Sequence, residues 1–255
     1  MQLRDMILRP PKLLFYGGFG TSKTATALTL GARAVVLDCD GGLRTGLTLK
    51  DKFLEDRLQV EVKNCLDDDP SKPIVYSKTK SYVDSIATEC RNGTCKYKAL
   101  IIDSLTALAD GVVNGVAVRN SRVGKTFEWA HWGMVENELV DILRTLKSLP
   151  IVAILIAHEQ IEKAPGTTDS YQSSISCPLN KLPPKIPTYF NEVWYFKSQT
   201  IGAGKASYTI KSFSTSNVSA KTQGQLPDNT DVNLGMVELL KLIGYDIDKG
   251  DIKNV

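Results

Sequence analysis

Short apolar runs separated by helical patterns recur along the chain. They are LLFY (13–16), AVVLD (34–38), ALIID (99–103), IVAILIA (151–157) and VWYF (193–196). Strands that alternate with helices predict an α/β fold with a mostly parallel central sheet and helices on its faces. The fourth run has no polar alternation, which is typical of a central strand that is covered on both sides.

The second half of the chain adds further elements to this pattern. Apolar residues recur at helical spacing between Val135 and Leu149, with charged residues between them, which predicts an amphipathic crossover helix. The run at 206–213 and a final helix near 236–243 are expected to close the sheet, with the C-terminal strands antiparallel.

Two long segments resist regular assignment. One runs from about Gly111 to Trp132, and the other runs from about Glu159 to Tyr189 and carries five prolines. Long loops inside a compact domain are usually functional or disordered. We therefore expect each segment to be either functional or disordered.

Length and composition bound the class of protein. The 255 residues predict a single domain spanning 1–255, with residues 1–12 as an arm for oligomer contacts and 246–255 as a solvated tail. No apolar run reaches the ~18 residues that cross a bilayer, so we expect no membrane contact. The five cysteines are scattered and odd in number, which fits reduced thiols in the cytoplasm. A net charge of +3 is too small to indicate a nucleic-acid partner by itself.

A glycine-rich stretch supplies the first candidate chemistry. GGFGTSKT (17–24) directly follows the strand LLFY and directly precedes a helical run, which is the context that makes a phosphate-binding P-loop match specific. Backbone amides of the loop can surround the phosphates of ATP, Lys23 can reach their outer oxygens, and the Thr24 hydroxyl can ligate Mg²⁺. The predicted nucleotide-binding residues are Gly17, Gly18, Phe19, Gly20, Thr21, Ser22, Lys23, Thr24 and Ala25.

One position departs from the usual motif. The residue before the lysine is normally glycine, and here it is Ser22. A Cβ where the backbone approaches phosphate can weaken binding or shift the loop. We expect Lys23→Ala to abolish ATP hydrolysis.

Polar residues follow three of the predicted strands. Asp103 ends ALIID, where a Walker B carboxylate holds magnesium through water, although an aspartate there can also cap the next helix. Asp40 follows the strand 34–38 just before two glycines, where turn formation is the alternative role. His158 and Gln160 follow IVAILIA at the crevice where open α/β sheets bind ligands. Either residue could contact the γ-phosphate and report its loss to the segment that follows, and the alternative role of His158 is structural.

In the order of six motifs, the chain resembles the phage-encoded, RecA-like P-loop ATPases that act as single-strand annealing or recombination proteins. The motifs are GGFGTSKT, LDCDGG, LIIDS, IAHE, NEVWYF and SAKTQGQLPD. The resemblance implies a RecA-like P-loop NTPase core that uses ATP and Mg²⁺. It assigns Asp40 to the attacking water, with aspartate in place of the usual glutamate.

The last motif is similar to an element that reaches into the nucleotide of a neighbouring subunit. Lys221 matches its lysine, but Gln223 stands where arginine is usual, and the chain has no arginine after Arg144. A lysine acting in this way implies a homo-oligomer, either a ring or a helical filament. The alternative for Lys221 is an exposed hairpin lysine.

In the resembled family, two loops after the Walker B strand and after the sensor line the DNA path. Both irregular segments lie at those places, and the first also holds Phe127, Trp129 and Trp132, which can stack with unpaired bases or pack into the core. The cations can hold phosphates or form a solvated face. The predicted DNA-binding residues are Arg119, Arg122, Lys125, Lys181 and Lys185.

The leading hypothesis is an ATP-dependent single-stranded DNA binding protein that promotes strand annealing or recombination in a bacterial host. Its ATPase activity is expected to be slow and DNA-stimulated, and a single-strand binding protein is a candidate partner. Two alternatives stay open: a ring-forming loader or remodelling ATPase that acts on a protein, and a nucleotide-binding assembly protein with little hydrolysis.

Overall fold

The computed structural model describes residues 9–48, 51–67, 69, 71–163, 170–202, 205–249 and 251–252. Parts of three predictions lie outside these residues: 1–8 of the N-terminal arm, 164–169 of the second irregular segment, and 250 and 253–255 of the tail. Among the described helices, none is long and apolar enough to span a bilayer.

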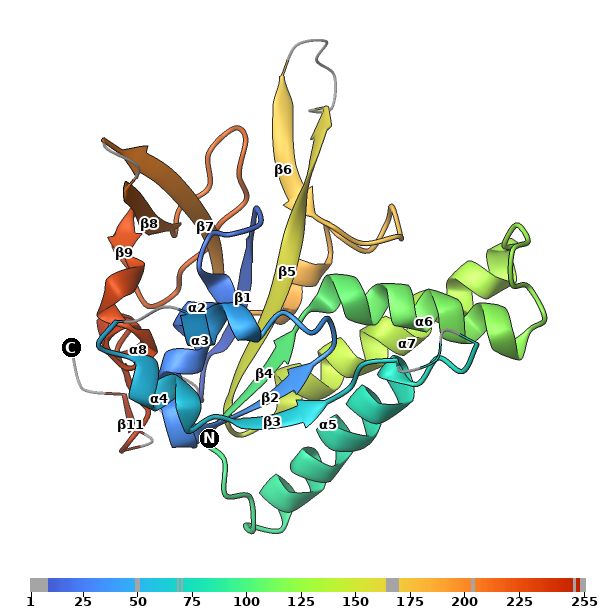
Figure 1. Ribbon diagram of the computed structural model, residues 1–255, viewed down its shortest axis with the longest axis horizontal. Coiled ribbons are helices and arrows are strands. Elements are labelled where there is room, and N and C mark those ends of the chain that lie inside the picture. The colour runs from blue at the N-terminus through green and yellow to red at the C-terminus, as the bar shows by residue number, and fades with distance from the viewer. Residues whose placement is uncertain are drawn as a thin grey trace.

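A mixed sheet in the order β3-β2-β4-β5-β1-β7-β8-β9 forms the centre of the molecule (Figure 1). The first six strands in this order run parallel, and they are β3 (Glu61–Asn64), β2 (Ala34–Asp38), β4 (Ala99–Asp103), β5 (Val152–Lys163), β1 (Lys12–Gly17) and β7 (Glu192–Ile201). The antiparallel strands are β8 (Lys205–Lys211), β9 (Thr230–Asp231) and β6 (Tyr171–Ile175), which pairs with β5.

Helices cover both faces of this sheet (Figure 1). One face packs against the three longest described helices, which are α5 (Val75–Arg91), α6 (Leu105–Arg119) and α7 (Trp129–Ser148). The other face packs against α2 (Lys23–Ala27), the 3-10 helix η1 (Leu28–Arg33) and α8 (Met236–Leu242). Short elements complete the fold: α3 (Arg44–Thr48), α4 (Leu54–Leu58), the 3-10 helices η2 (Ile186–Tyr189) and η3 (Val232–Leu234), and the hairpin β10 (Tyr245–Asp246) with β11 (Asp251–Ile252).

The alternation of side chains along β1 explains the two layers. Leu14 and Tyr16 belong to the core beneath α5, α6 and α7, whereas Leu13 and Phe15 belong to the core beneath α8. All four side chains are at most 2% exposed. A strand that is apolar on both faces is stable only when helices cover both, as the unbroken run LLFY predicts.

The first segment predicted to be irregular is mostly helical, so that prediction is wrong. Helix α6 ends at Arg119 and α7 begins at Trp129, which leaves a short turn between them. Two glycines and several valines lower the helix propensity of α6 and hide it in the sequence. Gly111 has a packing role, since a Cβ there would lie 2.0 Å from Cγ1 of Val75 on α5.

The second segment is also more regular than predicted. Strand β5 continues past the predicted end to Lys163 and pairs with β6, from Glu159 opposite Ile175 to Lys163 opposite Tyr171. This two-stranded ribbon projects from the body of the molecule (Figure 1). Hydrogen bonds to β6 satisfy the backbone groups of this extension of β5. Such pairing depends on a distant segment, so the local composition does not reveal it.

Both predicted ends need correction where the structure describes them. Lys12 belongs to β1 and is buried, so the expected arm is shorter than 1–12. In the expected tail, Ile247 is 2% exposed and packs into the core beneath α8. Asp248 pairs with Arg33, with Oδ1 2.6 Å from Nε.

The predicted fold class is confirmed. The sheet is mostly parallel, helices flank both faces, and the last strands of the sheet are antiparallel. Strand β5 lies between the P-loop strand β1 and the Asp103 strand β4. The carboxyl ends of β1, β2, β4 and β5 therefore meet at one edge, where the candidate site lies.

Candidate functional site

The P-loop connects β1 to α2 at this edge. Gly17 has φ 147°, and a Cβ there would lie 2.2 Å from the carbonyl oxygen of Phe196 on β7, so only glycine fits. Lys23 is 5% exposed. Its Nζ donates to the carbonyl oxygens of Gly17 (2.9 Å) and Gly18 (2.7 Å). The loop thus holds the ammonium where the phosphates of a nucleotide would be bound.

Burial has an electrostatic cost for this lysine. Desolvation lowers the pKa of Lys23 to about 8, while the nearby carboxylates of Asp103, Glu159 and Asp40 raise it. A phosphate is a further anion, so nucleotide binding will favour the charged ammonium.

Ser22 adopts the conformation for which glycine is usual. Its φ is 72° and its ψ is 13°, in the left-handed region. A residue with a Cβ pays about 1 kcal/mol or more to stay there. The serine in place of the usual glycine therefore strains the backbone at the N-cap of α2.

Thr24 and Asp103 meet between α2 and β4. The Thr24 hydroxyl donates to Oδ2 of Asp103 at 2.6 Å, although 79 residues separate them in the chain. Asp103 is 2% exposed, and burial raises its pKa to about 6. The hydrogen bond from Thr24 opposes that shift.

Asp40, just after β2, and His158, within β5, face each other. Nε2 of His158 lies 3.9 Å from Oδ2 of Asp40. The nearby imidazole of His158 lowers the pKa of Asp40. The other oxygen of Asp40 accepts from the amide of Gly42 at 2.8 Å, so the turn role also applies. The ring of Phe19, 82% exposed, lies 4.4 Å from the His158 ring between centroids.

Glu159 is the last residue of the motif IAHE, but the sequence predicts no role for it. Its Oε1 lies where a Cβ on Gly18 would be 2.9 Å away, and its charge raises the pKa of Lys23. Its other oxygen accepts from the Ser173 hydroxyl on β6. Glu159 thus joins the P-loop to the β5–β6 ribbon, and the only signal in the sequence is its place one residue after His158.

The residues present fit a magnesium nucleotide. Thr24 and Asp103 offer the hard oxygen ligands that Mg²⁺ prefers, and their 2.6 Å contact shows that they can share one hydrated ion. Such an ion neutralises phosphate charge during hydrolysis. In the described residues no group of three or more His, Cys, Asp or Glu side chains is placed to hold a metal ion.

A family model described as an AAA domain matches residues 9–224. The chain belongs to this AAA domain family. The match covers the P-loop, Asp40, Asp103 and His158, and it supports the assignment as a P-loop ATPase. No curated protein matches the chain significantly.

Two solved structures are similar to this AAA domain chain. One is a prototypical ATPase from the type III secretion system of pathogenic bacteria, with 16% identity over 74% of this chain and a TM-score of 0.48. The chain spans about half (52%) of that protein. The other is a KaiC-like protein from Pyrococcus horikoshii OT3, with 16% identity, 79% of each chain covered and a TM-score of 0.41.

Lys221 lies apart from this site within one chain of the AAA domain protein. It pairs with Val193 near the start of β7, and its Nζ donates to the carbonyl oxygens of Phe190 (2.6 Å) and Pro187 (3.2 Å). The buried Glu192 accepts from the amides of Gln223 and Gly224 and so fixes the segment. Burial lowers the pKa of Lys221.

The predicted DNA-binding residues gather around the α6–α7 turn and the first half of α7. Lys181 Nζ lies 5.7 Å from the centroid of the Trp129 ring, so the two predicted segments meet. Lys185 pairs with Glu136 of α7 at 3.2 Å, and the Nζ of Lys125 donates to the Ser121 carbonyl at 3.2 Å. The arginines are paired as well, Arg119 with Glu138 and Arg122 with Glu128.

The three aromatic residues of this region have different roles. Phe127 and Trp132 pack against the core, with ring centroids 5.0 Å apart. Trp129 is 84% exposed. Only Trp129 therefore offers an open ring for stacking among the three.

Proposed function

We propose that this AAA domain ATPase couples ATP hydrolysis to the binding of single-stranded DNA, as a strand-annealing or recombination protein. The observation that carries the proposal is the contact of Lys181 with Trp129, because it joins two distant segments into one cationic and aromatic surface. Arg122 lies in the turn between α6 and α7, and Lys185 contacts α7. Cations that hold phosphates beside an open aromatic ring suit unpaired strands.

The paired arginines do not argue against this role. Arg119 and Arg122 are bound to Glu138 and Glu128, and their side chains are 51% and 33% exposed. Surface ion pairs contribute only about 0–1 kcal/mol each. A phosphate backbone can therefore replace the glutamates at little cost, with the release of counterions as a gain.

Helix α6 provides a physical connection between the nucleotide site and this surface. It begins at Leu105, two residues after Asp103, and its far end carries Arg119. The amide of His158 donates to the Thr106 hydroxyl in its first turn at 3.1 Å. A change at the γ-phosphate that moves Asp103 or His158 would thus be transmitted along α6.

The test is ATP turnover with and without oligodeoxythymidylate across a salt series, in the wild type and in Arg122→Ala. We expect DNA to stimulate turnover, stimulation to fall steeply with salt, and Arg122→Ala to weaken stimulation while basal turnover persists. Arg91→Ala is the matched control, because it removes one exposed arginine from α5. Turnover that is indifferent to DNA at low salt would refute the proposal.

A second candidate, a loader or remodelling ATPase, is favoured by one observation. The same region exposes apolar side chains, with Val123 67% and Trp129 84% exposed. Exposed apolar patches mark protein contacts as well as stacking surfaces. Stimulation of turnover by a protein partner in the absence of DNA would favour this candidate.

Asp40 and Lys221 complete the proposed mechanism. Asp40, oriented by His158, polarises the attacking water. Lys221 acts on the nucleotide of a neighbouring copy after exchanging its carbonyl partners for phosphate. A head-to-tail contact of this kind gives a ring or a filament.

A further inference from the structure

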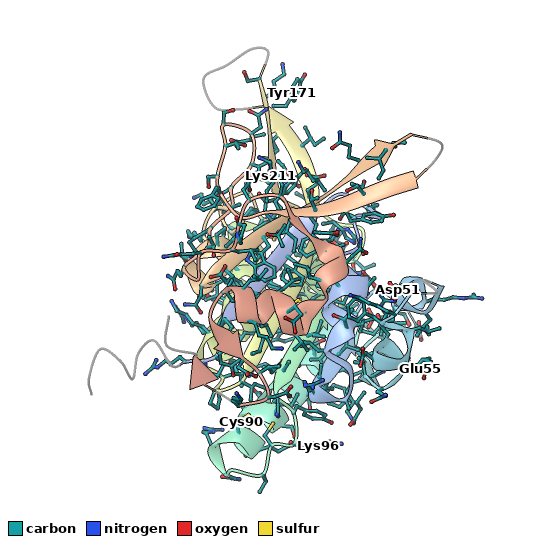
Figure 2. The ribbon with its side chains drawn as sticks, turned by 90° about the vertical axis from the view of Figure 1, so that its left-hand side faces the viewer. Asp51, Glu55, Cys90, Lys96, Tyr171 and Lys211 are labelled. Carbon is teal, nitrogen blue, oxygen red and sulfur yellow. The ribbon has the colours of Figure 1, made fainter. Side chains whose placement is uncertain are left out.

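A cavity of about 410 Å³ lies beside the P-loop strand. Its walls come from β6, from the proline-rich segment 180–187 and from the segment 214–219, and the Tyr16 side chain reaches it from β1. Cavities of this volume are large enough for a small molecule or one nucleotide unit. Figure 2 shows that Tyr171, the first residue of β6, lies far from Cys90 in the last turn of α5.

The lining of this cavity combines polar and apolar groups and is almost uncharged. Amide groups come from Gln172, Asn180 and Asn217, and Glu162 is the one charged side chain among the described lining residues. The buried Ser174 hydroxyl has no hydrogen-bond partner in the described part of the chain. Neutral donors and acceptors of this kind recognise an uncharged polar ring and give no attraction to phosphate.

Two lysines follow residues of the cavity lining in the chain, and their side chains reach α7. Lys181 directly follows the lining residue Asn180, and Lys185 directly follows the lining residue Pro184. Both lysines are exposed, and Lys181 lies over the open Trp129 ring. A ligand with a neutral ring and an anionic backbone would match the nearly uncharged cavity and the two lysines.

We propose that the cavity receives one unpaired nucleobase of a bound single strand, whose flanking phosphates lie along Lys181 and Lys185. The inference rests on the proposed function and adds a specific site to it. A base inside a duplex is stacked and paired, so it cannot enter without being extruded. The cavity therefore selects single strands over duplex.

Tyr16 joins this cavity to the nucleotide site. Its hydroxyl donates to the Ser219 carbonyl at 2.6 Å and accepts from the Ser219 amide at 3.0 Å. Burial raises the pKa of Tyr16, so the donor stays protonated. The next residue is Gly17, whose carbonyl binds Lys23. A base that moves the segment 214–219 would act on the P-loop through this contact.

The experiment compares binding of oligodeoxythymidylate with binding of an abasic strand of equal length, in the wild type and in Asn217→Asp. The substitution is nearly isosteric, its site is exposed, and it places a charge at the cavity wall. Loss of one base contact should weaken binding of the base-containing strand about tenfold and leave the abasic strand nearly unchanged. Asn92→Asp, exposed beyond α5, is the charge-matched control.

The possible outcomes separate strand binding, the base site and the coupling through Tyr16. If the wild type binds neither strand, the proposed function fails. If Asn217→Asp weakens both strands equally, or neither, strand binding stands and the base site is refuted. Tyr16→Phe should keep base-dependent binding and lose most DNA stimulation of turnover, and unchanged stimulation would refute the coupling.

Discussion

Lys12 shows how a single residue can set a pH dependence. It lies at the start of β1, is 4% exposed, and donates from Nζ to the carbonyl oxygens of Pro10 (2.7 Å) and Ile151 (2.8 Å). Burial lowers its pKa to about 7, from 10.5. At pH values between these two pKa values, the Lys12 side chain is therefore protonated in the unfolded chain and largely neutral in the folded protein.

The free energy of unfolding should accordingly rise with pH above about 7, by up to about 1.4 kcal/mol per pH unit from this residue. Lys12→Met should remove that contribution, which urea unfolding from pH 6 to 9 would measure as a difference between variants. Lys72→Met, at an exposed lysine, is the control. Equal pH slopes for the wild type and Lys12→Met would contradict the assignment.

Ser22 gives a second prediction at this scale. Ser22→Gly removes the Cβ from a residue with φ 72° and should stabilise the loop by up to about 1 kcal/mol. Tighter binding of ATP is expected to accompany it. Ser22→Ala keeps the Cβ and should show neither gain, so an equal gain from both variants would assign the effect to the hydroxyl instead.

Single residues of the site differ in how well the sequence predicts them. The P-loop and Asp103 are predictable because flanking strands and helices place their side chains, and the structure brings Thr24 and Asp103 into contact. Glu159 was missed because its approach to Gly18 depends on strand order, which a sequence pattern does not reveal. From the sequence, Ser22 was seen only to replace the usual glycine, and its left-handed backbone is visible only in the structure.

Among the helices and strands, α6 differs most from what the sequence predicts. The pattern of apolar runs gave β1, β2, β4, β5 and β7, because buried parallel strands are nearly continuous in apolar residues. It gave neither α6 nor β6. Helix α6 depends on close packing with α5 at Gly111, and β6 depends on pairing with β5, so both are stabilised by partners distant in sequence.

Packing of α6 on α5 can be tested with two glycines. Gly111→Ala should destabilise the protein by about 1–3 kcal/mol, because its Cβ would lie 2.0 Å from Val75 Cγ1. Adding Val75→Ala should recover part of the loss beyond additivity. Gly133→Ala on α7, where a Cβ meets nothing within 4 Å, should instead stabilise by about 0.5–1 kcal/mol. Equal effects at both glycines in urea unfolding would contradict the packing.

For the whole molecule, the place of Lys221 bears on assembly. One chain holds the nucleotide residues at one edge of the sheet, while Lys221 Nζ donates to the carbonyl oxygens of Phe190 and Pro187 of the same chain, near the start of β7. If a neighbouring copy supplies Lys221, turnover per chain should rise with protein concentration. Lys221→Ala should lower turnover at saturating ATP and leave ATP affinity largely intact. Constant turnover across dilution, with no oligomer detected by light scattering, would rule out this arrangement.

The central claim is that Lys23, Thr24 and Asp103 form one site for magnesium and ATP. The most direct measurement is steady-state ATP hydrolysis by the wild type, Lys23→Ala and the control Lys72→Ala, with urea unfolding to show that all three fold. We predict magnesium-dependent hydrolysis that Lys23→Ala lowers about a hundredfold or more and Lys72→Ala leaves unchanged. Wild-type turnover in folded Lys23→Ala would contradict it.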